Sequence, residues 1–288
     1  MKLGLHISNF TWPEGAPRLA AVLADVASAA DEAGFERISV MDHVWQIGVN
    51  GPPEMDMLEA YTALGFIAAH TSTAKLLTLV TGVTYRDPGL LAKAVTTLDV
   101  LSGGRAILGI GAAWNDEESR GLGLFFPSTK ERFERLEETL RICRQMFDGD
   151  ETAFDGTHYQ LGRLLNVPAP LAKPRLPILI GGGGEKKTLL LVAKYADATN
   201  LFPGPDVQHK LDVLKRHCEA VGRDYDEIEK TVMYRFDLGA QKVGEIIEDL
   251  RGLAAMGFTV GHGGIRNVYD TNQLEIFRKE IIPAVEAL

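Results

Sequence analysis

The sequence predicts an α/β fold, a closed (β/α)8 (TIM) barrel, and three observations support this prediction. Short apolar runs alternate with longer amphipathic stretches along the whole chain, eight such pairs can be counted, and 288 residues suffice for eight units. Strands that alternate with helices pair in parallel through right-handed crossovers. An open, doubly wound parallel sheet is the alternative fold for the same pattern.

The eight predicted strands are short and rich in apolar residues. They cover residues 2–8, 37–42, 76–83, 105–111, 177–182, 198–202, 230–237 and 258–264. In a barrel of this type the chemistry gathers where these strands end.

The predicted helices fill most of the intervals between the strands. They cover residues 17–33, 56–70, 88–102, 127–147, 186–195, 206–221, 241–255 and 271–286. Asp87 and Pro88 are typical of an N-cap followed by proline at the first helical position, and Gly103 and Gly104 are typical of a helix end. The third helix therefore has both boundaries marked in the sequence.

The interval 148–176 is too long for a simple loop. It is rich in proline and contains "FDGTHY", which is typical of a hairpin. We expect an excursion over one mouth of the barrel. No linker, repeat or shift in composition divides the chain, so residues 1–288 are predicted to form a single domain.

Composition excludes several kinds of partner. A formal charge of -9 argues against nucleic acid or an anionic membrane surface, because both reward clusters of Lys and Arg. No run reaches the roughly 18 apolar residues of a membrane span, and "MKLGLHISNF" lacks the apolar core of a signal peptide. Two cysteines without metal-binding spacing and histidines without an H-E-x-x-H pattern predict a cytoplasmic protein that binds no metal.

Aromatic and polar side chains follow the first, second and fourth strands. Among them are His6, Asp42 and His43, and the rings of Phe10, Trp12 and Trp114 are candidates to line a substrate pocket. A wide apolar pocket with a few placed polar groups suits a flat conjugated ligand. Alternatively, the tryptophans only cover the barrel mouth.

Four consecutive glycines, Gly181 to Gly184, follow the fifth strand and precede a helix. Backbone N–H groups in such a loop approach an anion closely, and the helix dipole adds to the attraction. We therefore expect a phosphate there, with a tight turn as the alternative. Lys186 occupies a position that both a Walker A loop and a G-x-G-x-x-G motif reserve for glycine, so neither motif is present.

Four segments together carry a resemblance to a known family. They are "MDH" at 41–43, "LVTGVTYRDPGLLAKAVTTLD" at 79–99, "GRAILGIGAAWNDEE" at 104–118 and "LPILIGGGGEKKTLLLVAKYADATN" at 176–200. The chain resembles the luciferase-like superfamily of flavin and deazaflavin enzymes, and more closely its branch dependent on coenzyme F420, a deazaflavin. The resemblance implies a (β/α)8 barrel, often a homodimer, with the cofactor at the strand C-termini and its phosphate on Gly181 to Gly184 and Thr188.

The resemblance also implies roles for residues nearer the ring. It aligns Asp42 and His43 with an acidic and histidine pair beside the ring, and Asn115 with an asparagine that contacts it. It places the segment Thr81, Gly82 and Val83 against the ring and aligns Gly82–Val83 with a non-prolyl cis peptide bond found in family members.

The expected activity is hydride transfer between the deazaflavin and a small organic substrate. His43, or else His6, is the candidate proton donor or acceptor, because the pKa of histidine lies near neutrality, with Asp42 orienting its neighbour. Ala112 stands where the sugar-phosphate dehydrogenases of this branch carry a catalytic glutamate, which favours reduction of an apolar or conjugated substrate. The alternatives are a monooxygenase dependent on flavin mononucleotide (FMN) and a cofactor-binding protein without turnover.

Overall fold

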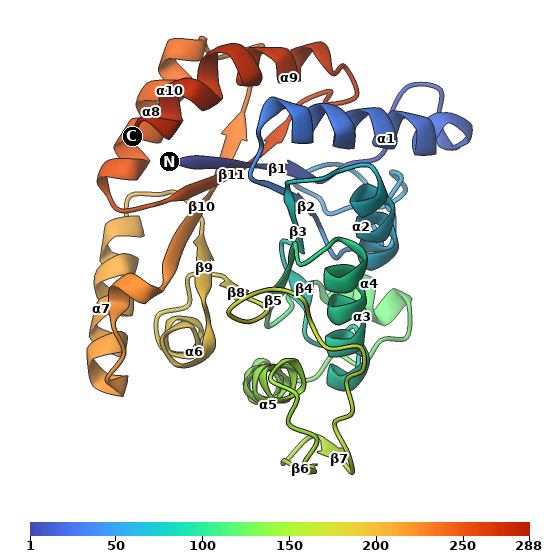
Figure 1. The fold of residues 1–288 in the computed structure, drawn as a ribbon, viewed down its shortest axis with the longest axis vertical. Coiled ribbons are helices and arrows are strands. Elements are labelled where there is room, and N and C mark those ends of the chain that lie inside the picture. The colour runs from blue at the N-terminus through green and yellow to red at the C-terminus, as the bar shows by residue number, and fades with distance from the viewer.

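The computed structural model describes all 288 residues and shows a closed barrel of parallel strands surrounded by helices (Figure 1). The barrel strands are β1 (Lys2–Ile7), β2 (Arg37–Val40), β3 (Lys75–Thr78), β4 (Thr81–Gly82), β5 (Ala106–Gly111), β8 (Ile178–Gly181), β9 (Ala198–Leu201), β10 (Glu229–Phe236) and β11 (Val260–Ile265). Pairing of β1 with β11 and of β3 with β5 closes the ring. The predicted barrel is therefore confirmed, and the open sheet is excluded.

The third predicted strand differs from the expectation. It is interrupted between β3 and β4, and the non-prolyl cis peptide bond joins Leu79 to Val80 at this interruption. The assignment of that bond to Gly82–Val83 is wrong by three residues. Thr81 and Gly82 instead resume the pairing with β5.

The helices form the outer layer of the barrel (Figure 1). They are α1 (Ala16–Ala33), α2 (Ala60–Ala69), α3 (Pro88–Leu101), α4 (Asp116–Gly121), α5 (Thr129–Phe147), α6 (Thr188–Tyr195), α7 (Val207–Val221), η1 (Tyr225–Glu227), α8 (Val243–Ala255), α9 (Asn272–Ile276), η2 (Phe277–Ile281) and α10 (Ile282–Glu286). Helix α2 begins four residues later than predicted, since Glu59 caps it by accepting hydrogen bonds from the amides of Tyr61 and Thr62. Helix α4 was not predicted.

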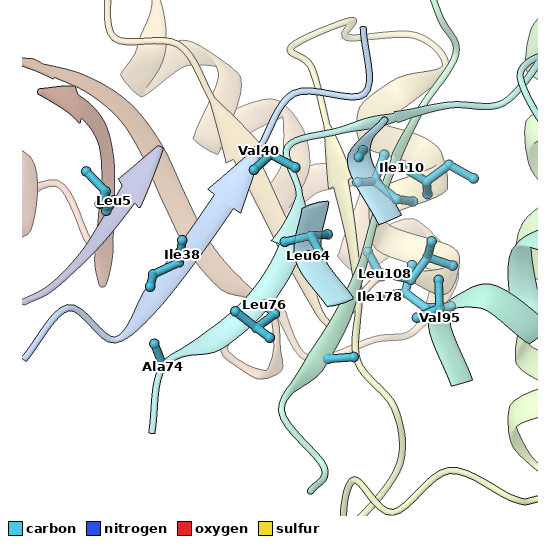
Figure 2. Close-up of a cluster of buried hydrophobic side chains, with 14 of the residues drawn as sticks. Leu5, Ile38, Val40, Leu64, Ala74, Leu76, Val95, Leu108, Ile110 and Ile178 are labelled. Atoms are coloured by element: carbon cyan, nitrogen blue, oxygen red, sulfur yellow. The ribbon is translucent and has the colours of Figure 1, made fainter. Parts of the chain in front are cut away.

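The main hydrophobic core lies between the strands and the helices (Figure 2). Every second residue of a strand points outward, so Ile38 and Val40 of β2 and Leu108 of β5 meet helical residues such as Leu64 and Val95. This alternation places the intervening residues inside the barrel.

The interior of the barrel is divided into an apolar side and a polar side. Leu77, Ile107, Leu179 and Ala198 form a small apolar cluster of their own, with Leu79 and Val80 packed against it. On the polar side, Nδ1 of His6 lies 2.9 Å from the Ser39 hydroxyl, and Thr231 donates to the Asn200 side chain. Because these side chains fill the interior of the barrel, a substrate would bind at the ends of the strands.

The excursion 148–176 contains the predicted hairpin, formed by β6 (Phe154–Asp155) and β7 (Gln160–Leu161). Glu138 of α5 accepts hydrogen bonds from three backbone amides of the hairpin, and Asp99 of α3 accepts from the amides of Leu171 and Ala172. The excursion thus lies beside α3 and α5 (Figure 1), and its residues Leu171 and Ala172 lie against Gly104, which precedes β5. This contact lies at the end of the barrel where the strands begin, and the expected position over one mouth stays a prediction.

The two chain ends meet at the opposite end of the barrel (Figure 1), where the Met1 amino group donates to the Val285 carbonyl at 2.7 Å. None of the helices combines the length and the apolar character needed to span a bilayer.

Candidate active site

The C-terminal ends of the strands bring together two different sets of groups. On one side, the loops after β2, β4 and β5 carry charged and aromatic side chains. On the other, the loops after β8 and β9 carry glycines and backbone amides. We call the first set the side-chain half of the mouth and the second set the backbone half.

Glu118 is the centre of the side-chain half. It lies in α4 and its side chain is 0% exposed. One carboxylate oxygen accepts from the backbone amides of Val44 and Trp45, and the other lies 2.7 Å from Nδ1 of His43. The Tyr85 hydroxyl donates to this second oxygen at 2.6 Å, and Asn115 donates to it at 3.2 Å. Glu118 therefore ties the loop after β2 to those after β4 and β5.

The charge of Glu118 is sustained by these donors. Burial alone would raise the pKa of its carboxyl, but the hydrogen bonds from His43, Tyr85 and the Trp45 amide together outweigh that cost and lower the pKa. Glu118 is consequently an ionised acceptor at neutral pH. The Trp114 ring flanks the His43 imidazole in an edge-to-face arrangement, and the centroids of the two rings lie 5.4 Å apart.

Asp42 lies next to His43 in the sequence but belongs to a separate network. Arg86 donates to both of its carboxylate oxygens, at 2.7 and 2.9 Å, and the Gly82 amide donates to one of them. Burial raises the pKa of Asp42 to about 6, and Arg86 limits the rise, so Asp42 is ionised at neutral pH. Arg86 also reaches Glu59 and lies over the Tyr61 ring.

His6 is less suited to proton transfer than the sequence suggests. It lies inside the barrel, and burial lowers its pKa to about 4, so the imidazole is neutral at physiological pH. The predicted role for His6 therefore has no support in its surroundings, whereas His43 stands at the mouth.

The predicted ring-contact segment is also largely buried. Thr81 is held by the hydroxyls of Thr78 and Tyr61, and the Val83 amide donates to the Gly111 carbonyl. The partly exposed residue is instead Val80, in the interruption between β3 and β4. A Cβ at Gly111 or Gly181 would lie 3.0 or 2.9 Å from a methyl group of Val80, so a larger residue at either position would displace the Val80 side chain.

The four consecutive glycines each have a local explanation. Gly181 makes room for Val80, and Gly182 has a φ of +110° that L-residues rarely adopt. A Cβ at Gly183 would lie 2.8 Å from Cδ of Lys210, and one at Gly184 would lie 2.8 Å from the Thr188 hydroxyl. Only the φ of Gly182 by itself requires glycine, because the atoms nearest a Cβ at the other three positions belong to side chains that can move.

The amides of this loop nevertheless suit an anion. The Gly182 amide is engaged, because it donates to the Asn200 carbonyl, but those of Gly183, Gly184 and Glu185 have no acceptor within the chain. They precede α6, whose dipole favours a negative charge at this end. Lys210 of α7 lies alongside and pairs with Asp206 at 2.8 Å.

The three predicted pocket aromatics separate into two groups. Phe10 is 1% and Trp12 7% exposed, and both belong to the main hydrophobic core. Trp114 is 63% exposed and stands at the mouth. Only Trp114 therefore offers its ring to a substrate in this conformation.

Several residues of the site were not predicted. They are Val80, Tyr85, Arg86, Glu118 and Lys210. Arg86 directly precedes Asp87 in a segment that carries the family resemblance, and Glu118 lies in the acidic run "NDEE", so both were within reach. Nothing in the sequence shows which acidic residue of that run becomes buried.

The closed barrel, with charged and aromatic groups gathered at its strand C-termini, is the architecture of a (β/α)8 barrel enzyme. The chain belongs to the luciferase-like monooxygenase family, whose model matches residues 1–241.

Relatives and solved structures agree with this membership. The chain is 31% identical over 248 residues to an F420-dependent glucose-6-phosphate dehydrogenase of Kineococcus radiotolerans, covering 82% of this chain and 69% of that protein. An F420-dependent secondary alcohol dehydrogenase in complex with an F420-acetone adduct superposes with a TM-score of 0.82 at 17% identity, over 99% of this chain and 98% of the other. A type II Baeyer-Villiger monooxygenase component of Pseudomonas putida in complex with FMN gives 0.76 at 16%, over 98% of each chain. At such identities the two structures show the fold alone.

Proposed function

We propose that this protein is a coenzyme F420-dependent oxidoreductase that transfers a hydride between the deazaflavin and a small organic substrate. The observation that carries the proposal is His43, a histidine at the mouth of the barrel whose Nδ1 contacts a buried carboxylate. Relatives about 30% identical that are named for F420 support the choice of cofactor.

The residues present fit such a cofactor. The free amides of Gly183, Gly184 and Glu185, together with the Thr188 hydroxyl and Lys210, would hold a phosphate. Val80 would present an apolar surface to a flat ring, because it is partly exposed over Gly111 and Gly181. Asp42 and Asn115 are engaged with Arg86 and Glu118, so they would act by shaping the ring site.

When bound, the deazaflavin supplies the hydride, and the chain must supply the proton and the geometry. His43 would exchange that proton through Nε2, which has no partner in the chain. Trp114 would pack against an apolar or conjugated substrate. Ala112, in place of an acid, would leave the pocket less polar, so we infer that the enzyme acts as a reductase of such compounds. We also infer a cytoplasmic homodimer.

Binding of F420 and of FMN to the purified protein, measured by fluorescence, tests the choice of cofactor. Preference for F420 supports the proposal, and preference for FMN with oxygen consumption after reduction indicates a monooxygenase. Binding of neither contradicts the proposed phosphate site.

Replacing His43 tests catalysis. We expect His43→Ala to lower kcat with an unsaturated acceptor by roughly 10²- to 10⁴-fold, because general acid–base catalysis contributes about that much. Affinity for F420 should change far less. An unchanged rate would exclude His43 as the proton carrier, and absence of turnover in wild type with every acceptor would favour a binding protein.

A further inference from the structure

We propose that Glu118 is the positioning residue that fixes His43 in one tautomer, with the ring proton on Nδ1 and the lone pair on Nε2. The inference deepens the proposed function and rests on it where catalysis is concerned. The tautomer itself is a property of the chain, and neither cofactor nor substrate is needed to observe it.

The contacts of Glu118 determine this tautomer. An ionised carboxylate can only accept hydrogen bonds. Nδ1 of His43 lies 2.7 Å from one carboxylate oxygen of Glu118, so Nδ1 must carry the hydrogen. The other oxygen accepts from the amides of Val44 and Trp45, the two residues that follow His43. Glu118 thus fixes both the ring and the backbone that carries it.

Two other carboxylates help to define this role. Asp42 is adjacent to His43 in sequence, but Arg86 occupies both of its oxygens. The orienting function that the sequence suggests for Asp42 therefore belongs to Glu118. Glu138 is also buried and accepts from backbone amides, three of them, but it does so in the distant hairpin. It provides a matched control for loss of a buried carboxylate.

The proposed arrangement has a consequence for proton transfer. In the reducing direction, His43 protonated on both nitrogens would give its Nε2 proton to the substrate, and a bound deazaflavin would supply the hydride. The Nε2–H bond of His43 and the C=O or C=C π bond of the substrate would break, and the π electrons would form the new O–H or C–H bond to this proton. The hydride would bring the electron pair of the second new C–H bond. Solvent then returns a proton to Nε2. Glu118 would stabilise the imidazolium before the transfer and would hold the Nδ1 hydrogen after it, because its carboxylate faces Nδ1.

The variant Glu118→Gln reverses the tautomer while preserving the shape of the side chain. A glutamine carbonyl would keep the two backbone amides of Val44 and Trp45, which need an acceptor. Its NH₂ group would then face Nδ1 of His43, which must accept, so the ring proton moves to Nε2. The same exchange in the catalytic triad of serine proteases, aspartate to asparagine, leaves the geometry intact but selects the wrong tautomer and lowers kcat by about 10⁴-fold.

Nitrogen-15 NMR of histidine-labelled protein without cofactor tests the proposal, with the His43 signals assigned from a His43→Gln variant. We expect Nδ1–H in wild type, in Tyr85→Phe and in Glu138→Gln, and Nε2–H in Glu118→Gln. A wild type with mainly Nε2–H, or a Glu118→Gln variant with an unchanged tautomer, overturns the proposal. If Glu118→Gln fails to fold, the wild-type spectrum alone decides.

Kinetics give the second readout. We expect Glu118→Gln to lower kcat by roughly 10³-fold or more and to alter the pH profile, with the Kd for F420 within about threefold of wild type. Glu138→Gln should lower thermal stability without this change in pH profile. An equal loss of rate in both variants would mean that Glu118 is only structural. If NMR finds the expected tautomers but wild type shows no turnover, the proposed function is contradicted and the positioning role of Glu118 stands.

Discussion

The two halves of the barrel mouth achieve their geometry in opposite ways. In the side-chain half, buried charges fix one another: Glu118 holds His43, and Arg86 holds Asp42. In the backbone half, the absence of side chains lets Val80, Lys210 and Thr188 approach the main chain closely. Buried charges are costly when one partner is lost, whereas free amides are redundant. Substitutions should therefore be severe in the first half and mild in the second.

The largest expected effect is on stability. Arg86→Met removes the bidentate partner of Asp42 and leaves a buried carboxylate with the Gly82 amide as its one remaining donor. We expect a loss of about 3–5 kcal/mol in the free energy of unfolding, measured by urea denaturation.

A matched variant away from the mouth provides the control. Arg144→Met also removes a cation from a partly buried carboxylate, that of Asp197, but Arg175 and the Ile178 amide remain to satisfy it. The loss should be smaller than in Arg86→Met. Equal losses of free energy of unfolding in the two variants would show that the ion pair at the mouth is no more sensitive than one elsewhere in the barrel.

The sequence predicts the two halves to different extents. The backbone half is visible in it, because four glycines in a row are a local signal that needs no knowledge of the fold. Even so, the close neighbours of Gly181 and Gly183 are tertiary: Val80 and Lys210 reach the loop from distant positions in the chain. The barrel was predictable because strand and helix periodicities repeat along the chain.

The side-chain half could be predicted only in part. His43 and Asp42 were recognised, but their partners were not, since Glu118 and Arg86 come from other strand ends. The burial of Phe10 and Trp12 likewise depends on packing against the rest of the core. The short helix α4, six residues long, is too brief for a periodic signal.

An intermediate effect is expected in the backbone half. Lys210 lies against Gly183 and pairs with Asp206. We expect Lys210→Met to raise the Kd for F420 by roughly tenfold at low salt, because one charge-assisted contact to a phosphate is lost while the amides remain. The rate at saturating cofactor should hardly change.

Lys215→Met provides the control for this variant, because Lys215 is an exposed lysine of the same helix. It should leave the Kd unaltered at every salt concentration. A Lys210→Met variant that binds F420 as wild type does would show that the phosphate relies on the backbone alone.

The smallest expected effect is a pH dependence in the side-chain half. The pKa of Asp42 is raised to about 6, so the carboxyl takes up a proton as the pH falls through 6 and its pair with Arg86 loses one charge. Between pH 7.5 and 5.5 the activity of wild type should then decline by roughly a few fold more than the activity of Asp42→Asn, because the asparagine side chain does not titrate.

Stability should respond to the same titration with the opposite sign. Because the folded-state pKa of Asp42 lies above its ordinary value of 3.8, the folded protein binds this proton more tightly than the unfolded chain. Between pH 6 and 4 the free energy of unfolding of wild type should therefore rise relative to that of Asp42→Asn as the pH falls. Denaturation of both proteins across this range measures the difference. A change in favour of the variant would mean that Arg86 outweighs burial and lowers the pKa of Asp42, so that acid would destabilise the side-chain half as it does a compensated ion pair.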